Sequence, residues 1–456
     1  MDLTSIEEVL DVLERHEQAA RRVINMVPSE NSMSGLAKLP LLLDVYHRYF
    51  FNTSESAEEW NFRGSQDVAR LETQFALKLL REFTGAKYVN LRPLSGLSGM
   101  AMVLSALGGG NGSKVMCVAP EQGGHYATAK LADRLGLKSS YITGPDPHTI
   151  DFERLAASLR REAPKLIYID QSNCLFPLDV EQLVIVVRDV APTTLVHVDC
   201  SHWLGLVFGG QMPNPLSLGA DSFGGSTHKS FPGPHKAIVA TNREDLWLEL
   251  SKAQYEMISS HHFAAAISLG IALLEFKMCG GARYAAALIE NTRELGAQLH
   301  ARGIHVVASD RGFSRGHQIW LRTSPSGIDA YEASDRLYRA GIRVNAFPEL
   351  PGIAERAIRL GVNEVTYHGL GIEDMGELAN IFASVLFDKV QPEQLSDRVA
   401  QLRTRYWQTY AFKSNDMRLF SRILKIVTCV MAPERVHEID RLLGELDLAF
   451  HPSVPC

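Results

Sequence analysis

A lysine set among small and polar residues, with an aspartate about thirty positions before it, has the residue types and spacing for chemistry. Lys229 lies within Gly224–Pro234, and Asp199 follows the mostly apolar run Leu195–Val198. A lysine that is desolvated enough to lose its proton forms Schiff bases. An aspartate at the end of a buried strand pairs with a pyridinium nitrogen, so that the ring acts as an electron sink. Each residue alone is more often a solvated lysine or a capped turn, but together they indicate an enzyme with a pyridine cofactor.

The sequence around both residues resembles serine hydroxymethyltransferases and their relatives among fold-type I pyridoxal-phosphate enzymes. Ser226–Pro234 is similar to the family's Thr-Thr-His-Lys-Thr-x-x-Gly-Pro run, and Asp199–Leu206 is similar to its Asp-x-Ala-His-x-x-Gly-Leu run. In that family the lysine carries the Schiff base, the aspartate binds the pyridinium nitrogen, and the histidine lies beside the ring's phenolic oxygen. The resemblance therefore implies pyridoxal 5'-phosphate as cofactor, bound by Asp199, His202, Thr227, His228 and Lys229.

Three further motifs extend the predicted cofactor site. A short expected strand, a small-residue turn and an apolar helix at Met100–Leu107 form an anion site, because backbone N–H groups at a helix start bind phosphate. In register with the family's Pro-x-Ser-Gly-Ser, the predicted phosphate cradle is Ser95, Gly96 and Ser98, with Leu97 where a second serine is usual. The family's Gly-Gly-His implies that His125 stacks on the ring. Ser172, after an expected strand at 166–170, lies where it would bond the phenolic oxygen.

The resemblance also implies substrate-binding residues and contacts across a dimer interface. A Ser-Glu-Asn run after an apolar stretch predicts Ser29 and Glu30 at the substrate carboxylate. The arginine of the Ile-Arg-x-Gly run, Arg359, would fork onto that carboxylate, a task that suits its bidentate geometry. Tyr46, favoured over Tyr49, would reach the cofactor phosphate of a partner subunit. For Lys236 two interpretations stay open, a phosphate contact across the interface or a plain surface lysine.

Two departures from folate-using members shape the functional hypotheses. Phe50-Phe51 and Trp60–Gly64 stand where those enzymes have Tyr-Ala-Glu-Gly-Tyr and Tyr-Tyr-Gly-Gly, and Phe347 lies in the region of an asparagine that contacts the pterin. The favoured function is a folate-independent aldolase or transaldolase that acts on the Cα–Cβ bond of threonine or serine, as in natural-product pathways. Its expected small-molecule partners are an amino acid and an aldehyde.

Three alternatives remain at this stage. One is a genuine folate-dependent serine hydroxymethyltransferase, and another is β-elimination or decarboxylative deamination of a modified amino acid. The third, from a different class, is a non-catalytic regulator that keeps the fold. In the enzyme hypotheses the catalytic residues are Lys229, Asp199 and His125, with His125 or an ordered water moving a proton during bond cleavage.

Length and composition set the outer bounds. The 456 residues carry a net charge of −6 and are 46% hydrophobic, which suits a globular protein and gives no basic footprint for nucleic acid. No long uncharged apolar stretch predicts a membrane span, the acidic start lacks a signal core, and the six scattered cysteines suggest neither zinc nor disulfides. We expect a cytoplasmic homodimer with shared active sites.

The alternation of strand and helix patterns predicts an α/β fold of the aspartate-aminotransferase type, with a mostly parallel sheet. The expected domains are an N-terminal helix and arm at 1–35, a large cofactor-binding domain at 36–278 and a small C-terminal α/β domain at 279–456. Expected helices are 5–23, 68–83, 264–276 and several within 375–449. Expected strands are 88–91, 114–118, 166–170, 195–198, 305–307, 318–321, 342–345 and 357–362.

Overall fold

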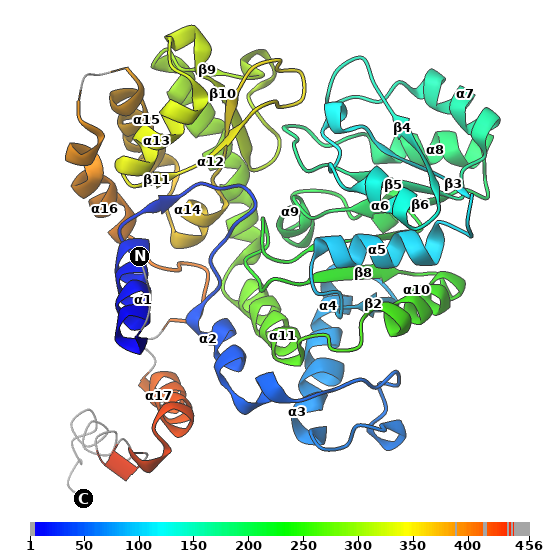
Figure 1. The fold of residues 1–456 in the computed structure, drawn as a ribbon, viewed down its shortest axis with the longest axis horizontal. Coiled ribbons are helices and arrows are strands. Elements are labelled where there is room, and N and C mark those ends of the chain that lie inside the picture. The colour runs from blue at the N-terminus through cyan, green and yellow to red at the C-terminus, as the bar shows by residue number, and fades with distance from the viewer. Residues whose placement is uncertain (1–4, 388–389, 414–416, 436, 439–440, 442–456) are drawn as a thin grey trace, which may run out of the picture.

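The largest sheet among the described residues is mostly parallel, has the strand order β2-β8-β7-β6-β5-β3-β4 and lies on the right in Figure 1. It is seen in a computed structural model that describes residues 5–387, 390–413, 417–435, 437–438 and 441. The strands are β2 (Tyr88–Asn90), β3 (Lys114–Val118), β4 (Lys138–Ile142), β5 (Leu166–Asp170), β6 (Leu195–Asp199), β7 (Ser222–Ser226) and β8 (Ala237–Thr241). Only β8 runs antiparallel to its neighbours β2 and β7. The predicted fold class is confirmed.

Successive residues of these strands enter different cores, so both faces of the sheet are covered. On β5, Leu166 and Tyr168 pack with α5 (Gly96–Leu107), α6 (Thr128–Arg134) and α10 (Glu244–Met257). Ile167 and Ile169 pack with the opposite core, which contains residues of α7 (Phe152–Glu162), α8 (Val180–Val190) and α9 (Leu204–Phe208). Burial on both faces explains why the strands are continuous apolar runs rather than alternating ones.

Parallel pairing brings the ends of the central strands to one edge of the sheet. Asp170 is in register with Asp199, and Asp199 is in register with Gly224. The loops that follow β5, β6 and β7 therefore lie side by side, and open α/β sheets bind their ligands at this edge. The Lys229 loop follows β7 directly.

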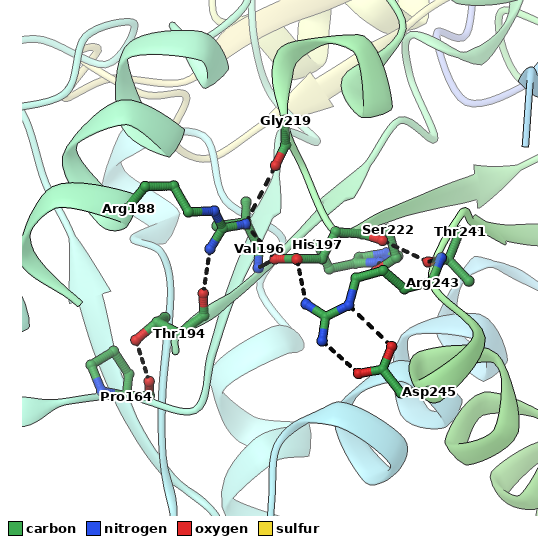
Figure 2. Close-up of polar contacts among 11 residues, drawn as sticks. Pro164, Arg188, Thr194, Val196, His197, Gly219, Ser222, Thr241, Arg243 and Asp245 are labelled. Atoms are coloured by element: carbon green, nitrogen blue, oxygen red, sulfur yellow. Dashed lines mark hydrogen bonds and ion pairs between the residues drawn. The ribbon is translucent and has the colours of Figure 1, made fainter. Parts of the chain in front are cut away.

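The opposite edge is fixed by a buried aspartate at the start of β7. Asp221 accepts hydrogen bonds from Arg188 at 2.7 Å, from the Val196 backbone N–H at 2.8 Å and from Arg243 at 2.8 Å. Figure 2 shows these arginines converging from α8 and from the segment before α10. The network ties β6 to β7 at the end remote from the Lys229 loop, so it holds the register without entering the site.

The chain before the first large-sheet strand is helical and irregular. Its helices are α1 (Ile6–Ala20), α2 (Gly35–Lys38), α3 (Gln66–Arg70) and α4 (Leu77–Thr84), with short 3-10 turns at Leu39–Leu42, Asp44–His47 and Ala57–Glu59. Ser5 and Glu8 form a capping box at the start of α1, which ends before the predicted residue 23. The helix predicted at 68–83 is interrupted by a π-helical segment, Leu71–Ala76, that joins α3 to α4.

A second, antiparallel sheet follows two long helices, α11 (Phe263–Met278) and α12 (Gly281–Ala301). Its strands, in the order β12-β13-β10-β9, are β9 (His305–Val306), β10 (Gln318–Arg322), β12 (Asn345–Phe347) and β13 (Ala357–Gly361). The remaining helices are α13 (Ala330–Arg339), α14 (Asn363–His368), α15 (Ile372–Leu386), α16 (Ser396–Thr404) and α17 (Met417–Met431). The helices predicted within 375–449 are confirmed as far as Met431, and the end of that range lies outside the described residues.

The N-terminal arm joins this second sheet region rather than the large sheet. A short strand, β1 (Ile24–Asn25), pairs in parallel with β11 (Ile342–Arg343). The strand predicted at 342–345 is thus split between β11 and the edge strand β12. The boundaries between the three expected domains stay predictions.

In the part of the chain that the structure describes, no single helix is long and apolar enough to cross a membrane. The bent pair α11 and α12 has the length and apolar composition of a membrane span, and no other feature of the described residues indicates one.

Candidate active site

A cavity of about 140 Å³ lies where β5, β6 and β7 end, against the start of α5. It is lined by Ser95, Gly96, Leu97, Met100, His125, Asp170, Gln171, Ser172, Asp199, Ser201, His202, Ser226, His228 and Lys229. Eight predicted site residues are therefore brought together by segments that lie more than a hundred residues apart in the chain. The others, namely Ser29, Glu30, Tyr46, Ser98, Thr227, Lys236 and Arg359, do not line it.

Asp199 ends β6 inside the sheet and presents a buried carboxylate to the cavity. Its two oxygens accept from neutral donors, the Tyr168 hydroxyl at 2.9 Å and the Ser201 backbone N–H at 2.8 Å. Among the described residues no lysine, arginine or histidine forms an ion pair with it. A buried carboxylate is stable when a cation pairs with it, and a pyridinium nitrogen is such a cation.

Lys229 lies in the loop after β7 and faces the same cavity. Burial lowers the pKa of its ammonium group, and Arg359 lowers it further, whereas the Asp199 carboxylate opposes the shift. Its Nζ makes no hydrogen bond to any residue that the structure describes. A partly desolvated amine with a lowered pKa is the nucleophile that Schiff-base chemistry requires.

The turn at the start of α5 is shaped for an anion. A Cβ on Gly96 would lie 2.4 Å from Ser226 Oγ, so a larger residue at this position would have to displace the Ser226 side chain. Ser95 caps the helix, because its hydroxyl accepts from the Ser98 N–H at 3.2 Å, and Ser98 Oγ accepts from the Ser95 N–H at 2.9 Å. Ser98 is thus half of a capping box, and the cavity is lined by Leu97 at its side. The cradle fits a phosphate through Gly96 and Ser95 better than through Ser98.

His125 is half-buried at the cavity wall and has a defined orientation. Its backbone N–H donates to Asp170 at 3.1 Å, and its Nδ1 accepts from the Ala127 N–H at 3.2 Å. The proton of the neutral ring therefore lies on Nε2. Burial lowers the pKa of His125, and Lys229 adds to this effect against the opposing pull of Asp199. One neighbour of the ring is Tyr126, which stacks on it with 4.6 Å between centroids.

Asp170 ends β5 and is in register with Asp199. Burial raises the pKa of Asp170 to about 7, although hydrogen bonds from Thr128 and the His125 backbone oppose this shift. Its role in the geometry is to fix the loop that carries His125.

Arg359 on β13 is buried and lacks an acidic partner among the residues described here. It donates to the Asn173 side chain, to the Ser172 carbonyl at 3.3 Å and to Asn345 at 3.3 Å, while its Nε has no partner. Burial lowers its pKa to about 10, so it remains a cation at neutral pH. Its guanidinium lies 4.5 Å from the centroid of the Phe347 ring. A buried cation with neutral neighbours and an unused N–H suits a carboxylate ligand.

The predicted substrate segment lies against the lysine loop. Asn31, next to Glu30, donates to the Lys229 carbonyl oxygen at 2.7 Å. Asn363 donates to the Glu30 carbonyl oxygen. Ser29 is half-buried, whereas the Glu30 side chain is exposed and accepts from Asn25 at 2.8 Å. Both roles at a substrate carboxylate stay predictions.

The surface interpretation of Lys236 is wrong. The residue is fully buried, and its Nζ donates to the His261 carbonyl oxygen at 2.7 Å and to the Arg92 carbonyl oxygen at 3.4 Å. Glu72 lies in the same cluster, bound by Arg92 Nε at 3.1 Å and by His261 Nε2 at 2.6 Å. Lys236 directly precedes β8. Its burial is possible because these carbonyl oxygens and this carboxylate interact with its ammonium group, and they come from segments that are distant in sequence.

Three other predicted residues have structural surroundings that the motifs did not specify. Thr227 is fully buried, and its hydroxyl donates to the carbonyl oxygens of Pro234 at 2.5 Å and Lys236 at 3.1 Å. His228 lines the cavity and stacks on His235 with 3.9 Å between centroids. Tyr46 is 51% exposed in a surface recess with His262, so any contact with a cofactor needs a second subunit.

Sequence motifs did not single out Ser201, Ser226 and Gln171, which line the cavity. Ser201 Oγ donates to Ser226 Oγ at 3.2 Å and accepts from the Ser226 backbone N–H at 2.9 Å. The available signal was position, since each ends or closely follows one of the strands β5, β6 and β7, which end at or lead into predicted ligands. His317 was also missed, and it contacts His202 from the second sheet at 3.1 Å.

Comparisons with known proteins identify the family of the chain. The family model described as serine hydroxymethyltransferase matches residues 3–382. An L-threonine:uridine-5'-aldehyde transaldolase from a Streptomyces species is 43% identical over 373 residues, which cover 81% of this chain and 89% of the relative. A serine hydroxymethyltransferase from Methanopyrus kandleri is 30% identical, covering 90% of this chain and 96% of the relative.

A solved structure matches as well. The crystal structure of L-threonine transaldolase from Pseudomonas fluorescens in its internal aldimine state has a TM-score of 0.82 and 25% identity, covering 92% of this chain and 97% of that one. Fold and site together define a transferase of the fold-type I pyridoxal-phosphate class. The chain belongs to the serine hydroxymethyltransferase family, which confirms the resemblance seen in its motifs.

Proposed function

We propose that this protein binds pyridoxal 5'-phosphate and is a folate-independent L-threonine transaldolase. The proposed cofactor rests on one observation, namely that Lys229 and Asp199 face the same cavity. Lys229 offers an amine with a lowered pKa, and Asp199 offers a buried carboxylate that meets only neutral donors in the described structure. When bound, the cofactor supplies an electron sink for cleaving a bond at the amino acid's Cα.

The residues of the chain supply binding and proton movement. Asp199 would hold the pyridinium nitrogen, while the Gly96 turn at the start of α5 would bind the phosphate. Arg359 would fork onto the amino acid's carboxylate, which fixes the orientation of the bonds at Cα. Neutral His125 carries its hydrogen on Nε2, and its Nδ1 accepts from the Ala127 N–H, so it would orient the β-hydroxyl oxygen by donating a hydrogen bond. An ordered water would then take the hydroxyl proton during bond cleavage. The amino acid and the aldehyde are the small-molecule partners of this proposal, and the homodimer stays part of it.

Two findings favour transaldolase activity over folate-dependent transfer. The transaldolase relative is more similar to this chain than the hydroxymethyltransferase relative, at 43% against 30% identity. Phe347, in the region of the family's pterin-binding asparagine, packs its ring against the Arg359 guanidinium and offers no hydrogen bond to a pterin. An aldehyde acceptor, as in the relative's name, is therefore the proposed second substrate.

The test is a spectral titration of the holoprotein with glycine, L-threonine and L-serine, each with and without tetrahydrofolate. We expect a long-wavelength band with threonine that needs no folate, and exchange of acetaldehyde for an added aldehyde. A band that appears with glycine only after folate addition would establish the hydroxymethyltransferase instead. Failure to bind pyridoxal phosphate would remove every enzymatic hypothesis. The absence of a long-wavelength band with all three amino acids would point to a modified substrate.

A further inference from the structure

A line of buried polar groups runs from the lysine loop to a histidine of the cavity wall. Asn363, at the start of α14, donates its side-chain nitrogen to the Glu30 carbonyl oxygen and, at 3.4 Å, to the Lys229 carbonyl oxygen. With its nitrogen held by two carbonyls, its Oδ1 lies on the other side, 3.2 Å from His317 Nδ1. An amide oxygen only accepts hydrogen bonds, so His317 Nδ1 carries a hydrogen.

The other nitrogen of His317 is then bare. Burial lowers the pKa of His317 to about 3, and the cations Arg359 and Lys229 act in the same direction against the Asn363 hydrogen bond. The ring is therefore neutral and has a single N–H group. Its Nε2 lies 3.1 Å from His202 Nδ1. Because two bare nitrogens at this distance repel each other, His202 Nδ1 must supply the hydrogen.

Gln318 offers the competing arrangement. Its Nε2 lies 3.3 Å from His202 Nδ1 and 3.0 Å from the Ser172 carbonyl oxygen, while Trp320 donates to its Oε1 at 3.3 Å. Donation from Gln318 would require a bare His202 Nδ1, which would then face the bare His317 Nε2. The closer contact, between the two histidines, therefore decides the proton position.

We propose that His317 is a positioning residue that holds His202 as the Nδ1–H tautomer, with a bare Nε2 on the cavity side. His202 lines the cavity, and its Nε2 has no hydrogen-bond partner within the described ranges. A bare imidazole nitrogen accepts a hydrogen bond from a hydroxyl group and repels a carboxylate. This edge of the cavity would thus take a hydroxyl-bearing part of the ligand, and the carboxylate is left to Arg359. The inference shares the site of the proposed function but does not depend on the reaction.

The experiment is imidazole ¹⁵N NMR of histidine-labelled holoprotein, with the His202 signals identified from a His202→Gln sample. We expect a protonated-type shift at His202 Nδ1 and a bare-type shift at Nε2. In His317→Phe the Gln318 amide becomes the remaining partner, so the two shift types should exchange. His317→Gln supplies an amide oxygen as acceptor and should restore the original assignment. His305→Phe, which changes an exposed histidine on β9, should change nothing.

Asn363→Leu gives an independent variant if His317→Phe does not fold. Without the Asn363 oxygen, His317 is free to move its hydrogen to Nε2, and the His202 shifts should again exchange. A bare-type shift at His202 Nδ1 in the wild type, or no exchange in either variant, would overturn the inference. If the exchange occurs in a protein without transaldolase activity, the inference stands and the proposed function falls. If the wild type is an active transaldolase but its His202 shifts contradict the assignment, only the inference falls.

Discussion

Lys229 and Lys236 are seven positions apart in one loop region, and burial lowers the pKa of both. Lys229 faces a cavity and makes no hydrogen bond to a described residue through its Nζ. Lys236 Nζ instead donates to two carbonyl oxygens and lies near the Glu72 carboxylate. Desolvation alone thus does not make a lysine reactive. The difference lies in access, because a nucleophile needs an unused nitrogen that a ligand can reach.

Replacing the two lysines should give the largest contrast. Lys229→Ala removes the amine that attaches the cofactor, so threonine turnover should fall to background. Borohydride reduction should then fail to fix the cofactor to the chain, as measured by mass spectrometry. The Lys236→Met variant should still be labelled at Lys229, because the Lys236 Nζ that it removes does not face the cavity. Labelling of Lys229→Ala at residue 236 would reverse the assignment.

Replacing Arg359 tests whether this buried cation binds the substrate. Arg359→Gln should raise the KM for threonine roughly 10- to 100-fold, since a charge-assisted hydrogen bond contributes about 1.5–3 kcal/mol. Cofactor attachment to Lys229, followed by absorbance, should persist. Arg356→Gln is the matched control, because Arg356 is exposed and pairs with Asp329 at 3.3 Å. Equal KM values for both variants would remove Arg359 from the carboxylate site.

Gly96 tests the shape of the cavity that makes Lys229 accessible. The Cβ of Gly96→Ala would press on Ser226 Oγ, and overpacking of this kind costs about 1–3 kcal/mol. We expect cofactor affinity to fall roughly tenfold or more, measured by fluorescence titration of the apoprotein. Gly110→Ala is the control, since its Cβ would meet nothing within 4 Å. Unchanged affinity in Gly96→Ala would show that the phosphate binds elsewhere.

The main expected effect of Lys236 is on the pH dependence of the free energy of unfolding. Burial lowers its folded pKa from 10.5 to about 7, so between these values the unfolded chain binds a proton that the folded chain lacks. This group therefore makes the free energy of unfolding rise with pH over that range, by at most about 1.4 kcal/mol per pH unit. Denaturant unfolding at pH 7, 8 and 9 should show a smaller rise in Lys236→Met than in the wild type. Lys252→Met, at an exposed position, should keep the wild-type slope.

Local patterns predicted the parts of the fold and site that depend on local sequence. The strands at 114–118 and 166–170 have the predicted bounds, because both faces of each are covered and the apolar runs are unbroken. The meeting of Asp199 and the Lys229 loop at one end of the strands could be predicted, because parallel strands place their carboxyl ends on the same side of a sheet. The environment of Lys236 did not, since its partners at Glu72, Arg92 and His261 come from distant segments.

The same limit applies to hydroxyl and imidazole groups. Ser98 matches a phosphate motif, yet its hydroxyl caps the helix with Ser95, and either use suits the same sequence. His317 directly precedes β10 of the second sheet, and nothing nearby in the sequence connects it to His202. Such contacts depend on how two sheets meet, which a residue pattern within one segment does not specify.

The pairing of β1 with β11 bears on the order in which the protein can be completed during synthesis. Ile24 leaves the ribosome early, but its partner Ile342 is made only after the whole large sheet. The arm that carries Ser29, Glu30 and Asn31 must therefore wait unpaired while the large sheet folds. The Lys229 loop and the Asn31 contact to its carbonyl oxygen involve only residues made earlier, so the pairing of β1 is the part that must come later. A nascent chain halted before residue 342 would thus hold a formed lysine loop and a β1 strand without its partner.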